Sequence, residues 1–248
     1  MAYPQHNSST SDRSDFATTR WSLVLTAGEQ DDSVSEKALA ELCQAYWYPI
    51  YAYVRRRLGD VHEAQDLTQA FFGQLLEKQT FRTADPNRGR FRAFLLTACK
   101  RFLINEWHKN RAAKRGGSTT QLSLDFPAGE SWYSLEPADT LTAERVFERQ
   151  WAITLLGRVL EQLKVECIAK GKGDHFEQLK PFLSGTKSAE VHDAAATALG
   201  ISSGAAKVAA HRLRTRYREL LRNEIAQTLD RPDGVEDEIH NLFAVLGT

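Results

Sequence analysis

The chain has 248 residues, enough for one or two domains that each have a hydrophobic core. Its 32 Lys and Arg balance its 32 Asp and Glu, and a hydrophobic content of 42% argues against disorder throughout. The longest apolar runs, such as residues 151–156, are too short to cross a bilayer, and the first ten residues lack the pattern of a secretion signal. We therefore expect a cytoplasmic protein with no membrane contact.

The predicted elements of the first half are all helical. Residues 1–17 are polar and rich in Ser and Thr, which predicts a disordered tail. Short and long helices are predicted at residues 20–27 and from Ser33 or Ser35 to Leu58, where Gly59 would end the second. Helical spacing recurs between residues 64 and 76 and, after a turn at 85–89, between residues 91 and 107. Strand-like alternation is absent, so residues 18–115 are predicted to form a helical bundle.

The second half is predicted to be a separate helical unit. Residues 116–141 combine Gly, Ser, Pro and acidic residues, which predicts a flexible linker with aromatic anchors at Phe126, Trp132 and Tyr133. A helical domain is expected over residues 142–222, with a break at 171–173 and a short helix near residue 176. Residues 223–248 are acidic, and apolar residues between Ile239 and Leu246 predict an amphipathic end helix. The predicted fold class is therefore all-α, with two helical domains.

The most specific local pattern lies at residues 191–217. It predicts a helix, a tight turn at residues 200–202 and a second helix that becomes strongly basic. Small residues at Ala196 and Gly200, with apolar Leu199 and Ala206, would let the two helices cross closely. This is the packing of a helix-turn-helix, which places its second helix in the major groove of DNA. The alternative is an ordinary helical hairpin with a solvated basic face.

Charge is distributed unevenly along the chain. Residues 88–115 and 207–222 are rich in Lys and Arg, and each segment contains a single acidic residue, Glu106 or Glu219. Acidic residues collect at 125–139 and 224–238 instead. Two separate basic faces on a neutral protein favour two contacts with one polyanion, because phosphate neutralisation by Lys and Arg drives such binding.

Catalytic and metal-binding patterns are not apparent. Cys43, Cys99 and Cys167 are widely spaced in apolar helical contexts, which predicts buried reduced thiols rather than disulfides or metal ligands. The seven histidines have no metal-ligand spacing, and no glycine loop fits a phosphate cradle. We therefore expect no metal, no cofactor and no enzymatic activity.

Several motifs together resemble a known family. Residues 42–60, which end in Arg-Arg-Arg-Leu-Gly-Asp, and residues 63–72 resemble the second domain of the extracytoplasmic-function (ECF) sigma factors of the sigma-70 family. Residues 90–107 resemble the segment of that domain that opens promoter DNA, and residues 191–217 resemble the fourth sigma domain. Residues 19–24 and 224–228 are similar to a planctomycete-type subset. The resemblance implies sigma domain 2 at 18–115, a linker at 116–141, sigma domain 4 at 142–222 and a C-terminal extension at 223–248.

The resemblance also implies partners and roles for particular residues. The partners are core RNA polymerase, through the clamp coiled coil of its largest subunit, and promoter DNA as duplex and melted single strand. The residues implied to bind the polymerase are Asp60, Glu63, Asp66 and Gln69. Those implied to bind the minus-ten element are Lys100, Arg101, Phe102, Asn105, Trp107, Lys109 and Arg111. Those implied to bind the minus-thirty-five element are Ser203, Ala205, Lys207, His211, Arg212, Arg214 and Arg216.

This chain departs from the family pattern at some of these positions. Gln65 stands where the family often has an acidic residue, and Phe102 could equally belong to the core. Ala205 and Ala209 replace polar residues of the second helix, which leaves Lys207, His211 and Ser203 for hydrogen bonds to base edges. The arginines that follow are interpreted as phosphate contacts, which position the helix without specifying sequence.

Alternative functions remain open at the level of sequence. One is a stand-alone, homodimeric helix-turn-helix regulator; another is a degenerate sigma-like adaptor that binds polymerase without reading DNA. An anti-sigma factor or other regulator is a further partner that the resemblance allows. The C-terminal extension either folds back on the basic fourth domain and weakens DNA binding or completes the core of that domain.

Overall fold

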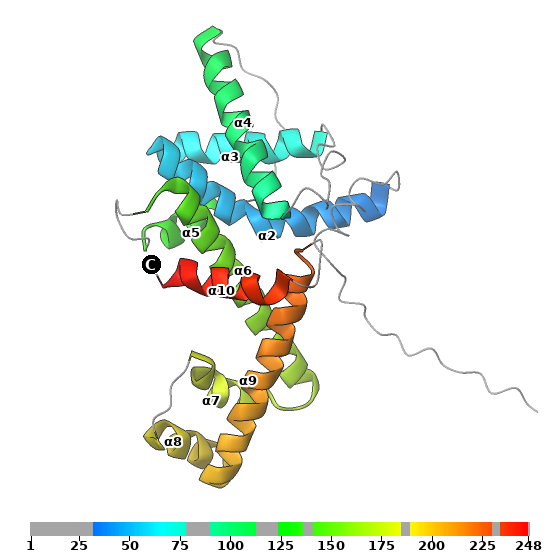
Figure 1. Cartoon of the computed structure of the whole chain (residues 1–248), viewed down its shortest axis with the longest axis vertical. Helices are drawn as coiled ribbons and strands as arrows, with labels where there is room; N and C mark the ends of the chain where they lie inside the picture. The colour runs from blue at the N-terminus through cyan, green and yellow to red at the C-terminus, as the bar shows by residue number, and fades with distance from the viewer. Residues whose placement is uncertain are drawn as a thin grey trace, which may run out of the picture.

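The computed structural model describes residues 32–77, 90–112, 124–135, 141–184, 189–229 and 234–247. Within these ranges every regular element is a helix and none is a strand, which confirms the predicted all-α class (Figure 1). The predicted tail at 1–17, the helix at 20–27 and the turn at 85–89 lie outside the described residues. No helix in the described part of the chain is long and apolar enough to cross a membrane.

Helix α2 (Asp32–Leu58) is the central element of the first half. Its residues 45–54 are all buried, because α3 (Val61–Glu77), α5 (Phe126–Tyr133) and α6 (Ala143–Ala169) pack around it. Gly59 ends α2 with φ +80°, a left-handed conformation that residues with a Cβ rarely adopt. The predicted helix end at Leu58 is confirmed.

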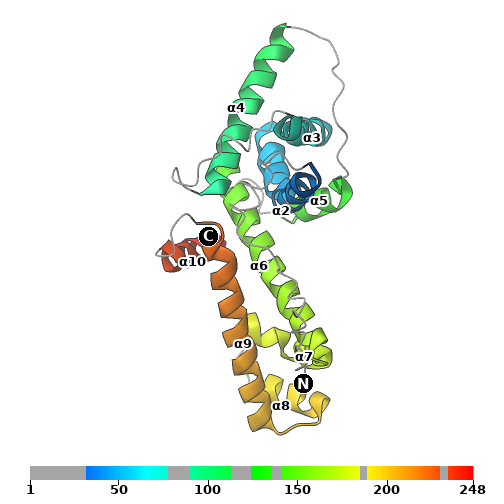
Figure 2. The same ribbon diagram turned by 90° about the vertical axis from the view of Figure 1, so that its right-hand side faces the viewer.

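Helix α4 (Phe91–Ala112) is anchored at one end and exposed at the other. Phe91 and Leu95 are almost fully buried, and the ring of Phe91 packs edge-on against Tyr46 of α2 at 5.3 Å. The C-terminal end of α4 projects beyond the other helices (Figures 1 and 2). The side chains of residues 110–112 lie outside the described part.

Part of the predicted linker is packed helix. The rings of Phe126 and Trp132 on α5 lie 6.1 Å from the ring of Trp47, so these predicted aromatic anchors contact α2. Gly129 lets α5 approach closely, because a Cβ at this position would lie 3.0 Å from the indole of Trp47. Residues 124–135 are therefore not flexible linker as predicted; residues 116–123 and 136–140 lie outside the described part.

Two long helices connect the halves of the molecule. Helix α6 packs against α2 near its N-terminal end and beside α9 (Ser203–Ala226) further along (Figure 2). The far end holds α7 (Gly173–Leu179), the 3-10 helix η3 (Lys180–Ser184) and α8 (Ala189–Leu199). Thr142 caps α6, accepting a hydrogen bond from the N–H of Arg145. The division into domains at residue 142 stays a prediction, since α6 contributes to both halves.

Helix α10 (Val235–Leu246) is the predicted amphipathic end helix. It lies across α6 and α9 and buries Leu242 against them (Figure 1). It therefore docks at the middle of the molecule and not on α8 or the start of α9.

Candidate nucleic-acid interface

Helices α8 and α9 form the predicted helix, turn and helix. Gly200 adopts φ +63°, and the N–H of Ile201 donates to the carbonyl of Ala196 over 3.0 Å, which closes the end of α8. The hydroxyl of Ser202 accepts a hydrogen bond from the N–H of Ala205 and caps α9. Ala196 and Ala206 are buried where the helices meet, so their small side chains allow the close crossing.

One stripe of α9 carries exposed cations. Lys207, His211, Arg214 and Arg218 follow one another at helical spacing and therefore share a face. Lys207, His211 and Arg218 are exposed, and none has an ion pair within the described part of the chain. Arg214 is half-buried, with its Nε 3.4 Å from the carbonyl oxygen of Ala210. Arg218, one of the arginines interpreted from the sequence as phosphate contacts, lies on this stripe by the same spacing.

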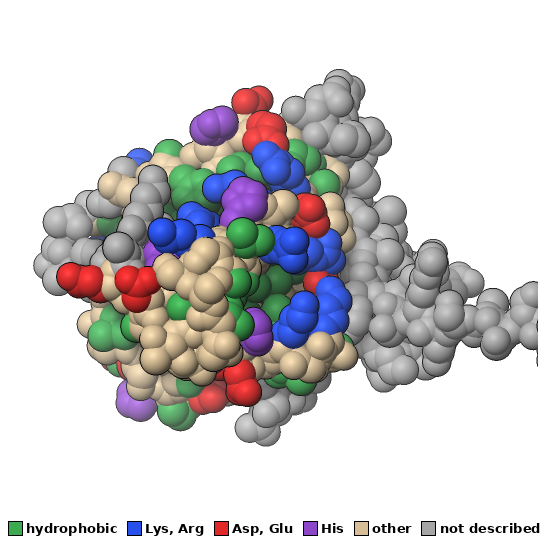
Figure 3. Space-filling view, turned by 90° about the horizontal axis from the view of Figure 1, so that it is seen from below, with side chains coloured by type: hydrophobic (Ala, Val, Ile, Leu, Met, Phe, Trp, Pro, Cys, Tyr) green, Lys and Arg blue, Asp and Glu red, His purple; other side chains and the backbone are tan. Residues whose placement is uncertain are grey.

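A second face of α9 borders an apolar groove. The groove lies between α6, α7 and α9 and has a volume of about 560 Å³. Ala205, Val208 and Ala209 line it, while Arg212 stands at the same wall and is exposed. Seen from below, Lys and Arg side chains gather around this hydrophobic hollow (Figure 3). The alanines that depart from the family pattern thus face the groove, off the stripe of Lys207. Half-buried Ser203 lies at the first turn of the same helix.

Arg216 is held by other side chains of the protein. Its guanidinium donates two hydrogen bonds to Glu166 of α6, at 2.8 and 2.7 Å, and a third to Glu219 at 2.9 Å. These hydrogen bonds raise the pKa of Arg216, and the bond from Arg216 lowers the pKa of Glu166. In this conformation the guanidinium joins α9 to α6, so the predicted contact of Arg216 with DNA phosphate would have to compete with these hydrogen bonds.

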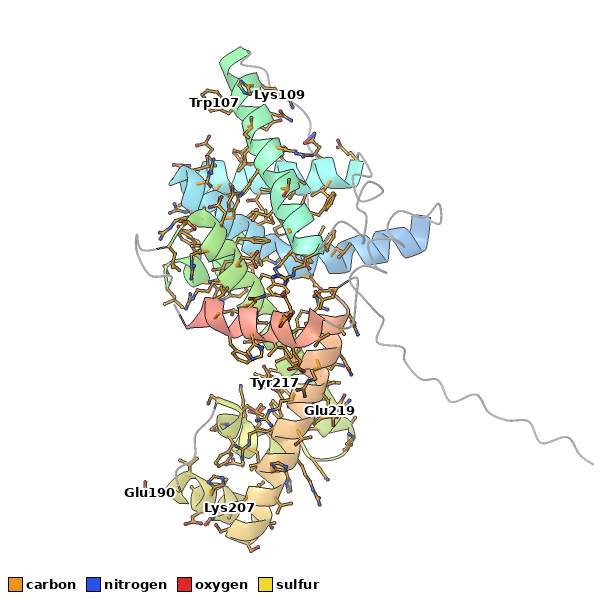
Figure 4. The ribbon with its side chains drawn as sticks, in the orientation of Figure 1. Trp107, Lys109, Glu190, Lys207, Tyr217 and Glu219 are labelled. Carbon is orange, nitrogen blue, oxygen red and sulfur yellow. The ribbon has the colours of Figure 1, made fainter. Side chains whose placement is uncertain are left out.

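The projecting end of α4 exposes polar and aromatic side chains together. Arg101, Asn105 and Trp107 are exposed, Trp107 by 56%, as predicted for groups that contact single-stranded DNA. His108 packs edge-on against Trp107 at 5.0 Å. Lys109 is exposed and forms an ion pair with Glu106 at 2.5 Å, while the side chain of Arg111 lies outside the described part. Figure 4 shows Trp107 and Lys109 at this end of α4 and Lys207 at the opposite end of the molecule.

Two predicted minus-ten residues have structural roles. Phe102 is only 6% exposed and its ring lies 5.6 Å from that of Phe71 on α3, so it is core and not part of an exposed base pocket. Lys100 pairs with Glu144 of α6 at 2.9 Å, and its hydrogen bond lowers the pKa of Glu144. Ile104, next to Asn105, is 53% exposed and was not among the residues predicted for this site. Its signal in the sequence is an apolar residue within a basic helix end.

The acidic side of α3 is exposed as the resemblance implies. Glu63 and Asp66 are exposed and lie three residues apart on one helical face, and Gln69, three residues further on, is half-buried. Asp60 is exposed, but its carboxylate accepts a hydrogen bond from the N–H of Glu63 at 2.8 Å. That bond lowers the pKa of Asp60 and makes it the cap of α3.

The cysteines show the expected thiol environment. Cys43 and Cys99 are buried, Cys167 is half-buried, and all three are free. Burial raises the pKa of Cys43 to about 11 and also raises the pKa of Cys99, which disfavours thiolate chemistry. Among the described residues no cluster of His, Cys, Asp and Glu could hold a metal ion.

The bundle of α2, α3 and α4 coincides with a known domain. Residues 42–113 match the family model of Sigma-70 region 2. This match covers under a third of the chain. It supports the assignment of the chain to the sigma-70 family and a role in polymerase binding and promoter recognition. No curated protein and no solved structure matches the chain. The exposed acids of α3 and the projecting end of α4 both fall inside the region 2 match.

Proposed function

We propose that this chain is an ECF-type sigma factor of the cytoplasm that binds core RNA polymerase and directs it to promoters with minus-ten and minus-thirty-five elements. It has no catalytic role of its own in this proposal, because the polymerase supplies the chemistry. The observation that carries the proposal is the coincidence of the region 2 match with a bundle whose α4 projects Arg101, Asn105 and Trp107 into solvent.

The end of α4 would hold the opened minus-ten strand. Unstacking a base costs a few kcal/mol, which stacking on an aromatic side chain and hydrogen bonds to the base edge must offset. Trp107 offers the aromatic face, Asn105 offers an amide that can donate and accept, and Arg101 offers a cation for phosphate.

Helix α9 would anchor the duplex at the minus-thirty-five element. Lys207 and His211, near its N-terminal end, are placed to meet base edges, while Arg218 further along would contact phosphate. The exposed acids Glu63 and Asp66 would face a basic surface of the polymerase, the clamp coiled coil in the family resemblance.

Polymerase capture tests the docking surface. The double variant Glu63→Gln, Asp66→Asn should weaken capture of core polymerase by the chain. The matched control Glu161→Gln, Glu190→Gln removes two exposed acids from α6 and α8 and should leave capture unchanged. Equal loss in both variants would show a general charge effect and remove the argument for α3. Run-off transcription with core polymerase on a genomic promoter library then tests initiation and returns the sequences recognised.

A second candidate, the adaptor that binds polymerase without reading DNA, is favoured by one observation. Arg216 is held by Glu166, and Ala205 and Ala209 border the groove, so few groups of α9 remain for base contact. Promoter affinity that is unchanged by Lys207→Ala and independent of salt would favour the adaptor. A true phosphate contact predicts affinity that falls with log salt at about −0.9 per phosphate.

A further inference from the structure

Helix α10 carries a charged residue in the middle of its apolar face. Val235, Glu238, Ile239, Leu242 and Leu246 share this face by helical spacing, and Glu238 is fully buried. A helix that only completed a core would do so at least as well with an apolar residue here, because removing a carboxylate from water is costly. Glu238 therefore calls for an explanation beyond packing.

The partners of Glu238 are two arginines at the start of α4. One carboxylate oxygen accepts a hydrogen bond from Nη1 of Arg92, which is itself nearly buried. The other oxygen lies 2.7 Å from Nη2 of Arg90, an ion pair without hydrogen-bond geometry, and the side chain of Arg90 is 37% exposed. Two guanidinium groups around one carboxylate form an arrangement that equally suits a phosphate.

Arg92 is positioned by groups other than α10. Its Nε lies 2.7 Å from Glu148 of α6, and its guanidinium stacks 4.1 Å from the ring centre of Trp151. Burial opposes its charge, but Glu148 and Glu238 outweigh burial and raise the pKa of Arg92. If α10 left, Glu148 and Trp151 would still hold Arg92 in place. The pair Arg90 and Arg92 would then face one carboxylate, which leaves one positive charge without a counterion.

We propose that Arg90 and Arg92 form a phosphate-binding position that Glu238 of α10 occupies in the free protein, so that α10 is an internal clasp that competes with DNA. The inference rests on the proposed function only in taking DNA as the polyanion. Other contacts of α10 include the exposed ion pair of Glu236 with Arg222 of α9, at 2.8 Å, and the packing of its apolar face, where Leu242 is buried, against α6 and α9. The clasp differs from a fold-back over the start of α9, because Glu238 meets two arginines at the start of α4.

Competition between α10 and DNA for the two arginines can be measured in the unmodified protein. If α10 and DNA exclude each other, each must weaken the binding of the other by the same factor. Saturating a full-length chain with a short duplex at low salt should therefore speed amide hydrogen exchange in residues 235–246. Unchanged exchange in this segment with DNA bound would overturn the proposal.

Charge variants test the position itself. In fluorescence anisotropy with the same duplex, Glu238→Gln should steepen the slope of log affinity against log salt by about 0.9, the value for one added phosphate contact. Asp237→Asn is the matched control, since it removes one negative charge from an exposed neighbouring residue and should leave the slope unchanged. Equal slopes for the two variants would refute a specific site at Arg90 and Arg92.

A truncation covers the case in which Glu238→Gln leaves α10 docked. A chain that ends at Leu229 should keep its helical circular dichroism and show the steeper slope, and adding Arg90→Ala should reverse it. Loss of the fold on truncation, or a slope equal to that of the full chain, would overturn the clasp. Capture of core polymerase by the chain separates this outcome from the proposed function. If the chain captures polymerase normally but DNA does not release α10, only the clasp is refuted. If DNA releases α10 but the chain does not capture polymerase, only the sigma assignment is refuted.

Discussion

Arg216 and Arg218 stand two residues apart on α9, and we predict opposite roles for them, because Arg216 is paired with acidic residues and Arg218 is exposed. Replacing Arg216 with Ala removes the two hydrogen bonds to Glu166 and the ion pair with Glu219. Since 40% of the Arg216 side chain is exposed, solvent screening limits the effect, and we expect a loss of about 1 kcal/mol in the free energy of unfolding. In a chain of this size that corresponds to roughly 2–4 °C in Tm. Arg218→Ala removes no ion pair within the described residues and should leave Tm unchanged.

DNA binding should show the reverse order. Loss of one phosphate contact reduces the slope of log affinity against log salt by about 0.9. When salt rises from about 50 to 200 mM, the fold-decrease in affinity of Arg218→Ala should therefore be smaller than that of the parent by a factor of roughly 3.5. Arg216→Ala should keep the slope of the parent. Calorimetric melting and anisotropy titrations on the same two proteins measure both effects. A reduced slope in Arg216→Ala, with Tm unchanged, would refute the assignment of Arg216 to the α6–α9 contact.

Three further predictions follow from burial and close contact. Phe102→Ala should lower the free energy of unfolding, measured in urea titrations, by about 3–5 kcal/mol. Trp107→Ala should leave that free energy nearly unchanged and reduce permanganate reactivity at an opened promoter. A loss of stability in Phe102→Ala well below this range would contradict the place of Phe102 in the core. Gly129→Ala should lower the free energy of unfolding by about 1–3 kcal/mol, because the added Cβ would press on Trp47. Gly157→Ala, which has open space around it in α6, should raise that free energy by about 0.5–1 kcal/mol. Equal effects of the two substitutions would show that α5 does not need its close approach to α2. The hydrogen bond from Arg216 lowers the pKa of Glu166, so the stability that Glu166 contributes is complete above its unfolded pKa of about 4.5 and is lost as pH falls through the lower folded pKa. In thermal melts from pH 6 to 3, Glu166→Gln should therefore show a smaller acid-induced drop in Tm than the parent. An identical drop in both proteins would exclude this contribution.

The helices themselves were largely predictable because their signals are local. Thr142 and Ser202 are good caps at the starts of α6 and α9, and Gly59 and Gly200 end α2 and α8 where only a left-handed residue closes the turn. Apolar spacing predicted α10 for the same reason. Such features depend on a few neighbouring residues and survive whatever the tertiary arrangement is.

The site residues were less predictable because their state depends on partners distant in sequence. Arg216 meets Glu166 fifty residues earlier, and Lys100 meets Glu144 on another helix, so a basic pattern alone could not separate these cations from exposed Lys207. The packing of residues 124–135 depends on the aromatic face of α2, which a Gly, Ser and Pro composition does not reveal. The role of Phe102 depended likewise on the neighbouring ring of Phe71.

A net charge of zero does not weaken the case for two DNA contacts, because the charges are separated in space. Acidic side chains near the middle of the molecule pair with arginines there, as Glu238 does with Arg92 and Glu236 with Arg222. The exposed cations on α4 and at the start of α9 stand at opposite ends (Figure 4). At physiological salt, interactions between exposed charges are largely screened beyond about 8 Å, so the charges beside each end matter more than the sum over the chain. Each end can therefore attract phosphate independently, and the whole-chain charge predicts neither affinity.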